Sequence, residues 1–187
     1  VVAYPLGVLI QKFVASYTDS NILVYTFLLV LSSSIALLFM AGPGELASKT
    51  IRRPETWVYA FLQIVTIFLG ILVMKYISAT EGVALGLMTG VFTLLLSAMF
   101  LHQGLNRFEI IGSLIILFGF SIVINNTGLP TELNLIVVFL IALRGFSQGC
   151  QKIIAEVHKT NRKAVSFKAQ IRVTGFIMAV ASFVFLL

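Results

Sequence analysis

Residues 22–41 read ILVYTFLLVLSSSIALLFMA, a run of twenty residues without a charge. A helix needs about 20 mostly apolar residues to cross the hydrocarbon core of a bilayer. Similar runs recur along the chain and give seven candidate spans, at residues 1–15, 22–41, 57–74, 82–101, 108–124, 133–150 and 169–187. These runs are uniformly apolar and too long for the alternating strands of a membrane barrel. The sequence therefore predicts an all-α polytopic membrane protein.

The composition of the whole chain leads to the same class. Of its 187 residues, 59% are hydrophobic and 11% are charged, and the mean hydropathy is +1.04. A soluble domain of this size has too little interior to bury so much apolar surface, and a disordered chain would be far more polar. The chain begins at Val1 without Met, and both of its ends are apolar. We therefore expect it to be a fragment of a longer protein.

Basic residues are distributed unevenly between the predicted loops. Most of them fall in loops 42–56, 102–107 and 156–167, whereas the alternate loops hold Lys75 alone. Short loops rich in Lys and Arg face the cytoplasm in most membrane proteins. We therefore expect these three loops on the cytoplasmic side.

An internal repeat is visible in the dipeptide Gln11-Lys12, which recurs as Gln151-Lys152 near the end of another predicted span. Five spans separate the two starting points, and five is an odd number, so the second copy must cross the membrane in the opposite sense. Inverted repeats of this kind are typical of secondary transporters. The sequence predicts that residues 1–124 form the first repeat of five helices and that residues 133–187 begin the second with two helices.

Four short segments match a known family in their order and spacing. They are MKYISAT at 74–80, MTGVFTLLLS at 88–97, FLHQGLN at 100–106 and IGSLIILFG at 111–119. Together they resemble the end of the first repeat of the EamA-type family of the drug/metabolite transporter superfamily. The resemblance implies a ten-helix bundle of two inverted five-helix repeats, here truncated after the seventh helix. It also implies a central cavity that opens alternately to the two sides of a bacterial-type cytoplasmic (inner) membrane.

The leading functional hypothesis is a secondary transporter or exporter of a small metabolite, such as an amino acid or an organic acid. The alternative is a structural or assembly subunit whose basic loops bind lipid or a partner protein. A homodimer that completes the second repeat also stays open. We do not expect an enzyme, a cofactor or a metal site, because His102, His158 and Cys150 lack the spacing of ligands or of a catalytic group. Nor do we expect a nucleic-acid partner, because the positive-inside rule already accounts for the basic loops.

Ionisable and amide side chains inside the spans are the candidates for substrate binding, because such groups are costly in lipid and usually face a cavity. They are Arg144, Lys12, Lys152, Arg172, Gln11, Gln148 and Gln63, and Gln151 is a further amide of this kind. Arg144 lies deepest and would bind a carboxylate or a phosphate through two hydrogen bonds. All of these except Arg172 have a structural alternative: hydrogen bonds between helices for Arg144 and the amides, and a position at the lipid headgroups for the lysines.

Small residues form a second set of candidates. Gly82, Gly86 and Gly90 are spaced at i, i+4 and i+8 and would share one helix face, and Gly145 and Gly149 repeat the spacing. Glycines let helices approach closely in lipid, either as a sliding surface for gating or as static packing. Pro5 would kink the first span beside the cavity.

Overall fold

The computed structural model describes residues 22–44, 48–78, 81–82, 86–102, 104–126, 128, 130–160 and 167–186. Within these ranges every regular element is a helix. The helices are α2 (Ile22–Ala41), α3 (Ser48–Ile51), α4 (Pro54–Tyr76), α6 (Met88–Phe100), α7 (Arg107–Asn125), α8 (Thr131–Thr160), α9 (Phe167–Ser182) and the 3-10 turn η1 (Phe183–Leu186). The predicted span at residues 1–15 lies outside the described part of the chain.

Five of the described segments are long and apolar enough to cross a membrane. They are α2, α4, α7, Thr131–Val157 of α8, and Lys168–Phe185, which joins α9 to η1. Large apolar side chains stay exposed along them, as Ile115 and Phe118 do on α7, and such surface is expected to face lipid. The prediction of an all-α polytopic membrane protein is confirmed.

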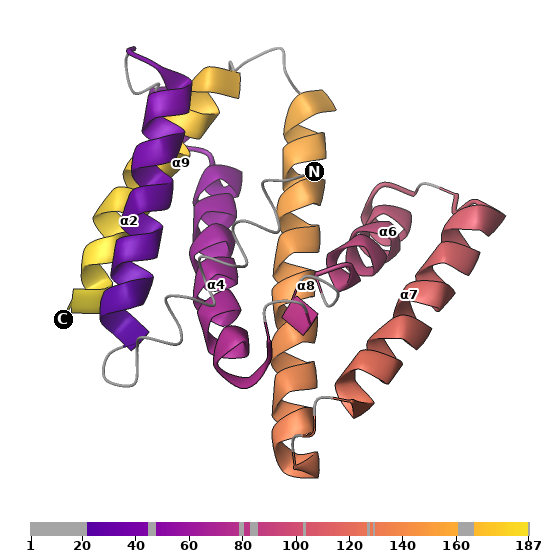
Figure 1. Cartoon of the computed structure of the whole chain (residues 1–187). Helices are drawn as coiled ribbons and strands as arrows, with labels where there is room; N and C mark the ends of the chain where they lie inside the picture. The colour runs from indigo at the N-terminus through magenta and orange to yellow at the C-terminus, as the bar shows by residue number, and fades with distance from the viewer. Residues whose placement is uncertain are drawn as a thin grey trace.

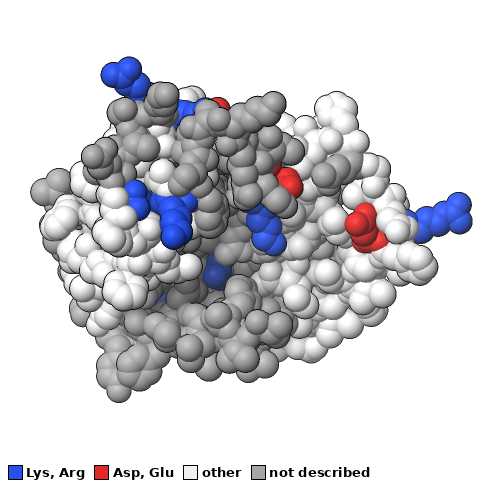
Figure 2. All heavy atoms as spheres, turned by 90° about the horizontal axis from the view of Figure 1, so that it is seen from above, with Lys and Arg blue, Asp and Glu red and all other residues white. Residues whose placement is uncertain are grey.

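The helices run alternately up and down, so that their connections gather at two ends (Figure 1). α2 and α9 pack together on one side of the bundle, and α8 packs against both α4 and α6. The end of α2, the start of α7 and the end of α8 all lie at the upper end of Figure 1, which is the end of the three basic loops. Figure 2 looks onto this end and shows more basic than acidic side chains over it.

Two apolar clusters hold the bundle together. One joins α2, α4 and α9 and contains Val30, Ala60, Ile67, Ile71, Val173, Ile177 and Met178. The other joins the end of α4, the start of α6, the end of α7 and the first half of α8, and contains Val73, Met74, Ile77, Met88, Ile124, Val137 and Ile141. Because α4 runs down and α8 runs up, the second cluster closes the lower half of the space between these helices.

The predicted span at residues 82–101 is not one continuous helix, because α6 begins only at Met88. The amide of Gly86 donates to Gly82 O, but the amide of Gly90 donates to Leu87 O, which is the tighter i to i−3 pattern of a turn. Glycine weakens a helix by about 1 kcal/mol relative to alanine, and three of them fall within this stretch. The expected common face of Gly82, Gly86 and Gly90 is therefore interrupted by a turn.

Glycines of α8 allow the close crossing of α6 and α8. A Cβ atom added at Gly145 would lie 2.7 Å from a ring carbon of Phe92, and one at Gly149 would lie 3.3 Å from backbone atoms of Phe92 and Thr93. A side chain at Gly145 would displace the ring of Phe92, and one at Gly149 would press on the backbone of α6. Gly145 and Gly149 thus both lie in the contact between α6 and α8.

The change Gly149→Val should lower the thermal stability of the purified protein in detergent. Overpacking of this kind costs about 1–3 kcal/mol. The matched control is Gly119→Val on α7, where an added Cβ meets nothing within 4 Å. Equal melting temperatures for the two variants would show that α6 and α8 do not cross this closely.

Candidate functional site

A cavity of about 640 Å³ lies between α4, α6 and α8, and we call it the outer cavity. It is lined by Tyr59, Gln63, Thr66, Gly86, Leu87, Thr89, Gly90, Ile116, Gln148, Gln151, Lys152 and Ala155. Its volume falls within the range of roughly 300–1,000 Å³ that is usual for small-molecule sites. Seven of these twelve described residues carry an amide, a hydroxyl or a charge, and the other five are glycine or apolar.

Two polar helix faces form opposite walls of the outer cavity. On α4, Tyr59, Gln63 and Thr66 follow the spacing i, i+4 and i+7, which places them on one face. On α8, Gln148 and Lys152 are four residues apart and also share a face. Because α4 descends and α8 ascends, Tyr59 and Lys152 lie toward the basic end of the bundle, whereas Thr66 and Gln148 lie deeper.

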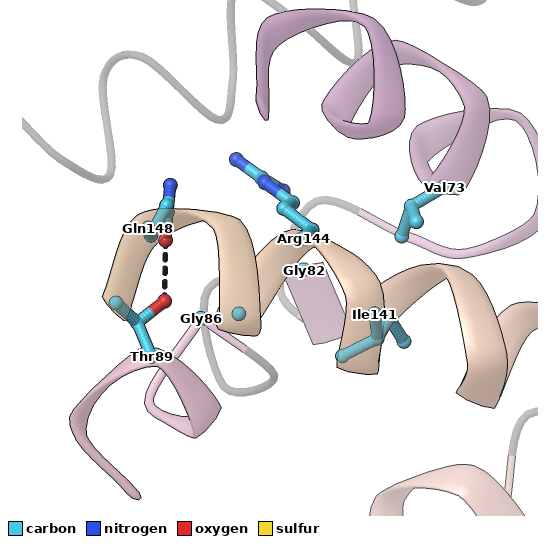
Figure 3. A pocket seen from close by; sticks show the side chains of 8 residues that line it. Val73, Gly82, Gly86, Thr89, Ile141, Arg144 and Gln148 are labelled. Atoms are coloured by element: carbon cyan, nitrogen blue, oxygen red, sulfur yellow. Dashed lines mark hydrogen bonds between the residues drawn. The ribbon is translucent and has the colours of Figure 1, made fainter. Parts of the chain in front are cut away.

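Hydrogen bonds between side chains tie α8 to both of its neighbours. The Nε2 of Gln151 donates to the Oγ1 of Thr66 on α4 over 2.8 Å, and this pair is buried. The Oγ1 of Thr89 on α6 donates to the Oε1 of Gln148 (Figure 3). Both amides therefore take part in contacts between helices, and Gln148 keeps its NH2 group for another partner.

A second, much smaller space adjoins the outer cavity, and we call it the inner pocket (Figure 3). It is lined by Val73, Gly82, Gly86, Thr89, Ile141, Arg144, Gly145 and Gln148, and its volume of about 10 Å³ is room for one water molecule at most. Gly86, Thr89 and Gln148 line both spaces. In Figure 3 the side chains of Arg144 and Gln148 leave α8 in the same direction.

Arg144 and Lys152 occupy different depths along α8. With a rise of 1.5 Å per residue, Arg144 lies roughly 20 Å from the start of a helix that is about 45 Å long, and Lys152 lies about 12 Å nearer the basic end. Arg144 is half-buried with its Nε fully enclosed, whereas Lys152 is exposed. The spacing of Arg144, Gln148 and Lys152 at i, i+4 and i+8 makes one polar stripe along α8.

The structure brings together part of the predicted site. Gln63, Gln148 and Lys152 line the outer cavity with Gly86 and Gly90. Arg144 lines the inner pocket with Gly82, Gly86, Gly145 and Gln148. Gly149 lies in the α6–α8 contact, outside the lining of either space. Lys12, Gln11 and Pro5 belong to the part of the chain that the structure does not describe.

Arg172 holds the end of α2 rather than lining either space. Its Nε and Nη2 donate to the carbonyl oxygens of Ala41, Gly42 and Pro43 over 3.1–3.3 Å. The last carbonyls of a helix lack partners within the helix, and a cation there is also favoured by the helix dipole. Arg172 thus fastens α9 to the C-terminus of α2.

Sequence reasoning missed three polar residues of the outer cavity, namely Tyr59, Thr66 and Thr89. The signal for the first two was the polar i, i+4, i+7 face that they form with Gln63. Thr89 is a single hydroxyl beside Gly90 in an apolar run, and its role depends on the distant Gln148. No spacing within its own segment indicates that contact.

The change Arg172→Ala should lower the melting temperature of the protein in detergent, because hydrogen bonds from a charged donor contribute about 1.5–3 kcal/mol. Lys168→Ala, one turn earlier on α9 and exposed, is the control and should change little. An Arg172→Ala variant with unchanged stability but no substrate binding would assign Arg172 to the substrate path instead.

The chain was compared with known proteins. A family model described as the EamA-like transporter family matches residues 5–125, well over half of the chain, and the match ends at the last residue of α7. No curated protein and no solved structure matches the chain significantly. Among the described residues, no three His, Cys, Asp or Glu side chains are grouped so that they could hold a metal ion.

Proposed function

The chain belongs to the EamA-like transporter family, and on this premise we propose that it moves a small metabolite across the membrane by alternating access. Membership of this family was predicted from the sequence and is confirmed. The family and the membrane-spanning helices support a transporter-like role rather than an enzymatic one.

The observation that carries the proposal is the outer cavity, an open space between helices whose lining includes several polar side chains and a lysine. Polar and ionisable groups at membrane depth are costly and mark substrate pathways. The described residues that line the cavity include Lys152 but no Asp or Glu, and Arg144 lies just beyond them. This charge favours a substrate with a carboxylate, such as an organic acid or an amino acid, whose polar remainder would contact Gln63 and Tyr59.

Alternating access is supported by the difference between the two halves of the bundle. The outer cavity lies in the half that faces the basic loops, and Figure 2 shows the surface hollowed near its middle at this end. The other half is filled by the apolar cluster around Met88 and Ile141. The positive-inside rule assigns the basic end to the cytoplasm. In our proposal the described conformation is therefore open toward the cytoplasm.

We further propose that residues 1–124 and 133–187 belong to two inverted repeats. α2 and α9 would be the second helices of the two repeats, and they run in opposite directions while packing together. Their backbones approach closely, because a Cβ added at Gly175 would lie 3.1 Å from Ser34 O. An antiparallel pair of equivalent helices is the arrangement that an axis in the membrane plane produces.

Transport should depend on the charge of Arg144. The experiment reconstitutes the chain in liposomes and measures uptake of labelled amino acids and organic acids, with each liposome batch tested for protein content. Arg144→Gln should reduce uptake of the transported compound about tenfold or more, because it removes charge-assisted hydrogen bonds. Arg107→Gln, an exposed arginine at the start of α7, is the matched control and should retain uptake.

Melting curves of the two variants show whether a loss of uptake reflects misfolding. Normal uptake by a folded Arg144→Gln variant would remove Arg144 from the substrate path. A wild-type chain that transports none of the compounds would contradict the transport proposal and favour a structural or assembly subunit.

A further inference from the structure

We propose that the outer cavity and the inner pocket are two successive stations for a carboxylate moving along α8, and that the Thr89–Gln148 hydrogen bond is the barrier between them. The inference rests on the proposed transport function and adds to it the order of the binding steps and the residue pair that controls passage. It is argued from the volumes of the two spaces, the residues that they share and the spacing of the two cations.

The outer station is the part of the cavity near Lys152. The ammonium group is exposed and lies on the wall of a space of about 640 Å³, which is large enough for an organic acid or an amino acid. Among the described lining residues no carboxylate competes for this cation. A carboxylate that enters from the basic end therefore meets a charge-assisted hydrogen-bond donor first.

The inner station is the pocket around Arg144. A guanidinium binds a carboxylate through two parallel hydrogen bonds, which a lysine cannot do. The pocket is also walled by apolar Val73 and Ile141, so the charge of a bound anion would be poorly screened and its attraction to Arg144 strong. With room for one water at most, however, the pocket is closed to any metabolite in this conformation.

The barrier lies where the two spaces meet. Gly86, Thr89 and Gln148 are the residues that both spaces share, and the hydrogen bond from Thr89 to Gln148 bridges α6 and α8 at this level. Gln148 lies about 6 Å along the helix axis from each of the two cations. Because its Oε1 accepts from Thr89, its NH2 group is the part that an anion can contact while it passes from Lys152 to Arg144.

The segment that carries Thr89 is suited to move. It follows the turn at Gly86 and Leu87, where the i to i−3 hydrogen bonds begin and where α6 is not yet a regular helix. Breaking the Thr89–Gln148 hydrogen bond would remove the polar contact between this segment and α8, and the neighbouring Met88 would stay anchored in the apolar cluster. The barrier is thus a polar side-chain contact that lies beside a glycine-containing turn, where the helix is weakened.

The test measures the access of a small water-soluble reagent to the inner pocket, in the chain reconstituted in liposomes. Cys150→Ser removes the native thiol, and new thiols are placed by Ile141→Cys in the inner pocket or by Ala155→Cys in the outer cavity. The probe is 2-sulfonatoethyl methanethiosulfonate, an anion, and the readout is the rate of modification. Melting curves confirm that each variant is folded.

Thr89→Val keeps the shape of the side chain and removes the donor, whereas Thr89→Ser keeps the hydroxyl. We expect Thr89→Val to raise the modification rate at position 141 about fivefold, the factor that corresponds to one ordinary hydrogen bond, and Thr89→Ser to leave it low. The rate at position 155 should not change in either variant. Gln148→Met removes the other partner and should act like Thr89→Val, which keeps the test decisive if one variant misfolds.

Equal modification rates at position 141 for Thr89→Val and Thr89→Ser, together with no effect of Gln148→Met, would show that the Thr89–Gln148 hydrogen bond is not the barrier.

A second labelling experiment tests the two stations by comparing the anionic reagent with its cationic trimethylammonio analogue. Each rate is divided by the rate of the same reagent with a free thiol in solution, and on this scale the anion should react several-fold faster at position 155. Lys152→Gln should remove this preference, whereas Lys75→Gln should not. In the Thr89→Val variant the same preference should appear at position 141 and should disappear with Arg144→Gln.

If the anionic reagent is not preferred at position 155, Lys152 does not form an outer station. If it is not preferred at position 141, Arg144 does not form an inner station. Labelling requires no substrate transport, so its outcome is separate from that of the uptake experiment. If the chain takes up substrate but Thr89→Val does not change the modification rate at position 141, the transport function stands and the barrier is excluded. The expected labelling in a chain that transports none of the tested compounds would keep the barrier and contradict the transport proposal.

Discussion

The hydrocarbon core of a membrane offers no hydrogen bonds, and this constraint decides where the polar groups of the chain lie. A polar side chain or an irregular stretch of backbone at this depth must be enclosed by protein or must face a water-filled space. α8 shows both solutions, because Gln151 is buried against Thr66 whereas Lys152 faces the outer cavity. The turn at Gly86 and Leu87 follows the same rule, since both residues line that cavity.

The site follows from how three helices meet. Glycines at 145 and 149 bring α8 close to α6, while the Gln151–Thr66 hydrogen bond ties α8 to α4 beside the outer cavity. The same arrangement places Arg144 at the floor of the polar region and Lys152 near its mouth. Arg144 and Lys152 therefore lie at different depths along one face of α8, and in the proposed function this difference would give an anionic substrate a direction of travel.

The helix bounds predicted from the sequence agree with the structure where a run is free of charges and glycines. They differ where charged or amide side chains or glycines interrupt the apolar run. The bounds of α2 agree residue for residue, because no charged residue, glycine or proline interrupts that run. α8 continues ten residues beyond the predicted end at 150, since its polar stripe resembles a loop in composition but lies on one helix face. Arg144 and Gln148 were found as polar groups inside a span. Thr89 was not, because its partner is distant in the sequence.

The proposed function requires that one face of α8 lines the water-filled outer cavity while another face contacts lipid. The most direct measurement introduces single cysteines along α8 in a Cys150→Ser background and measures modification by a water-soluble maleimide in liposomes. The account predicts modification at positions 148, 152 and 155 and none at 139, 143 and 146, where exposed Phe139, Leu143 and Phe146 are expected to face lipid. Uniform modification along the helix, or none at 148 and 152, would contradict it.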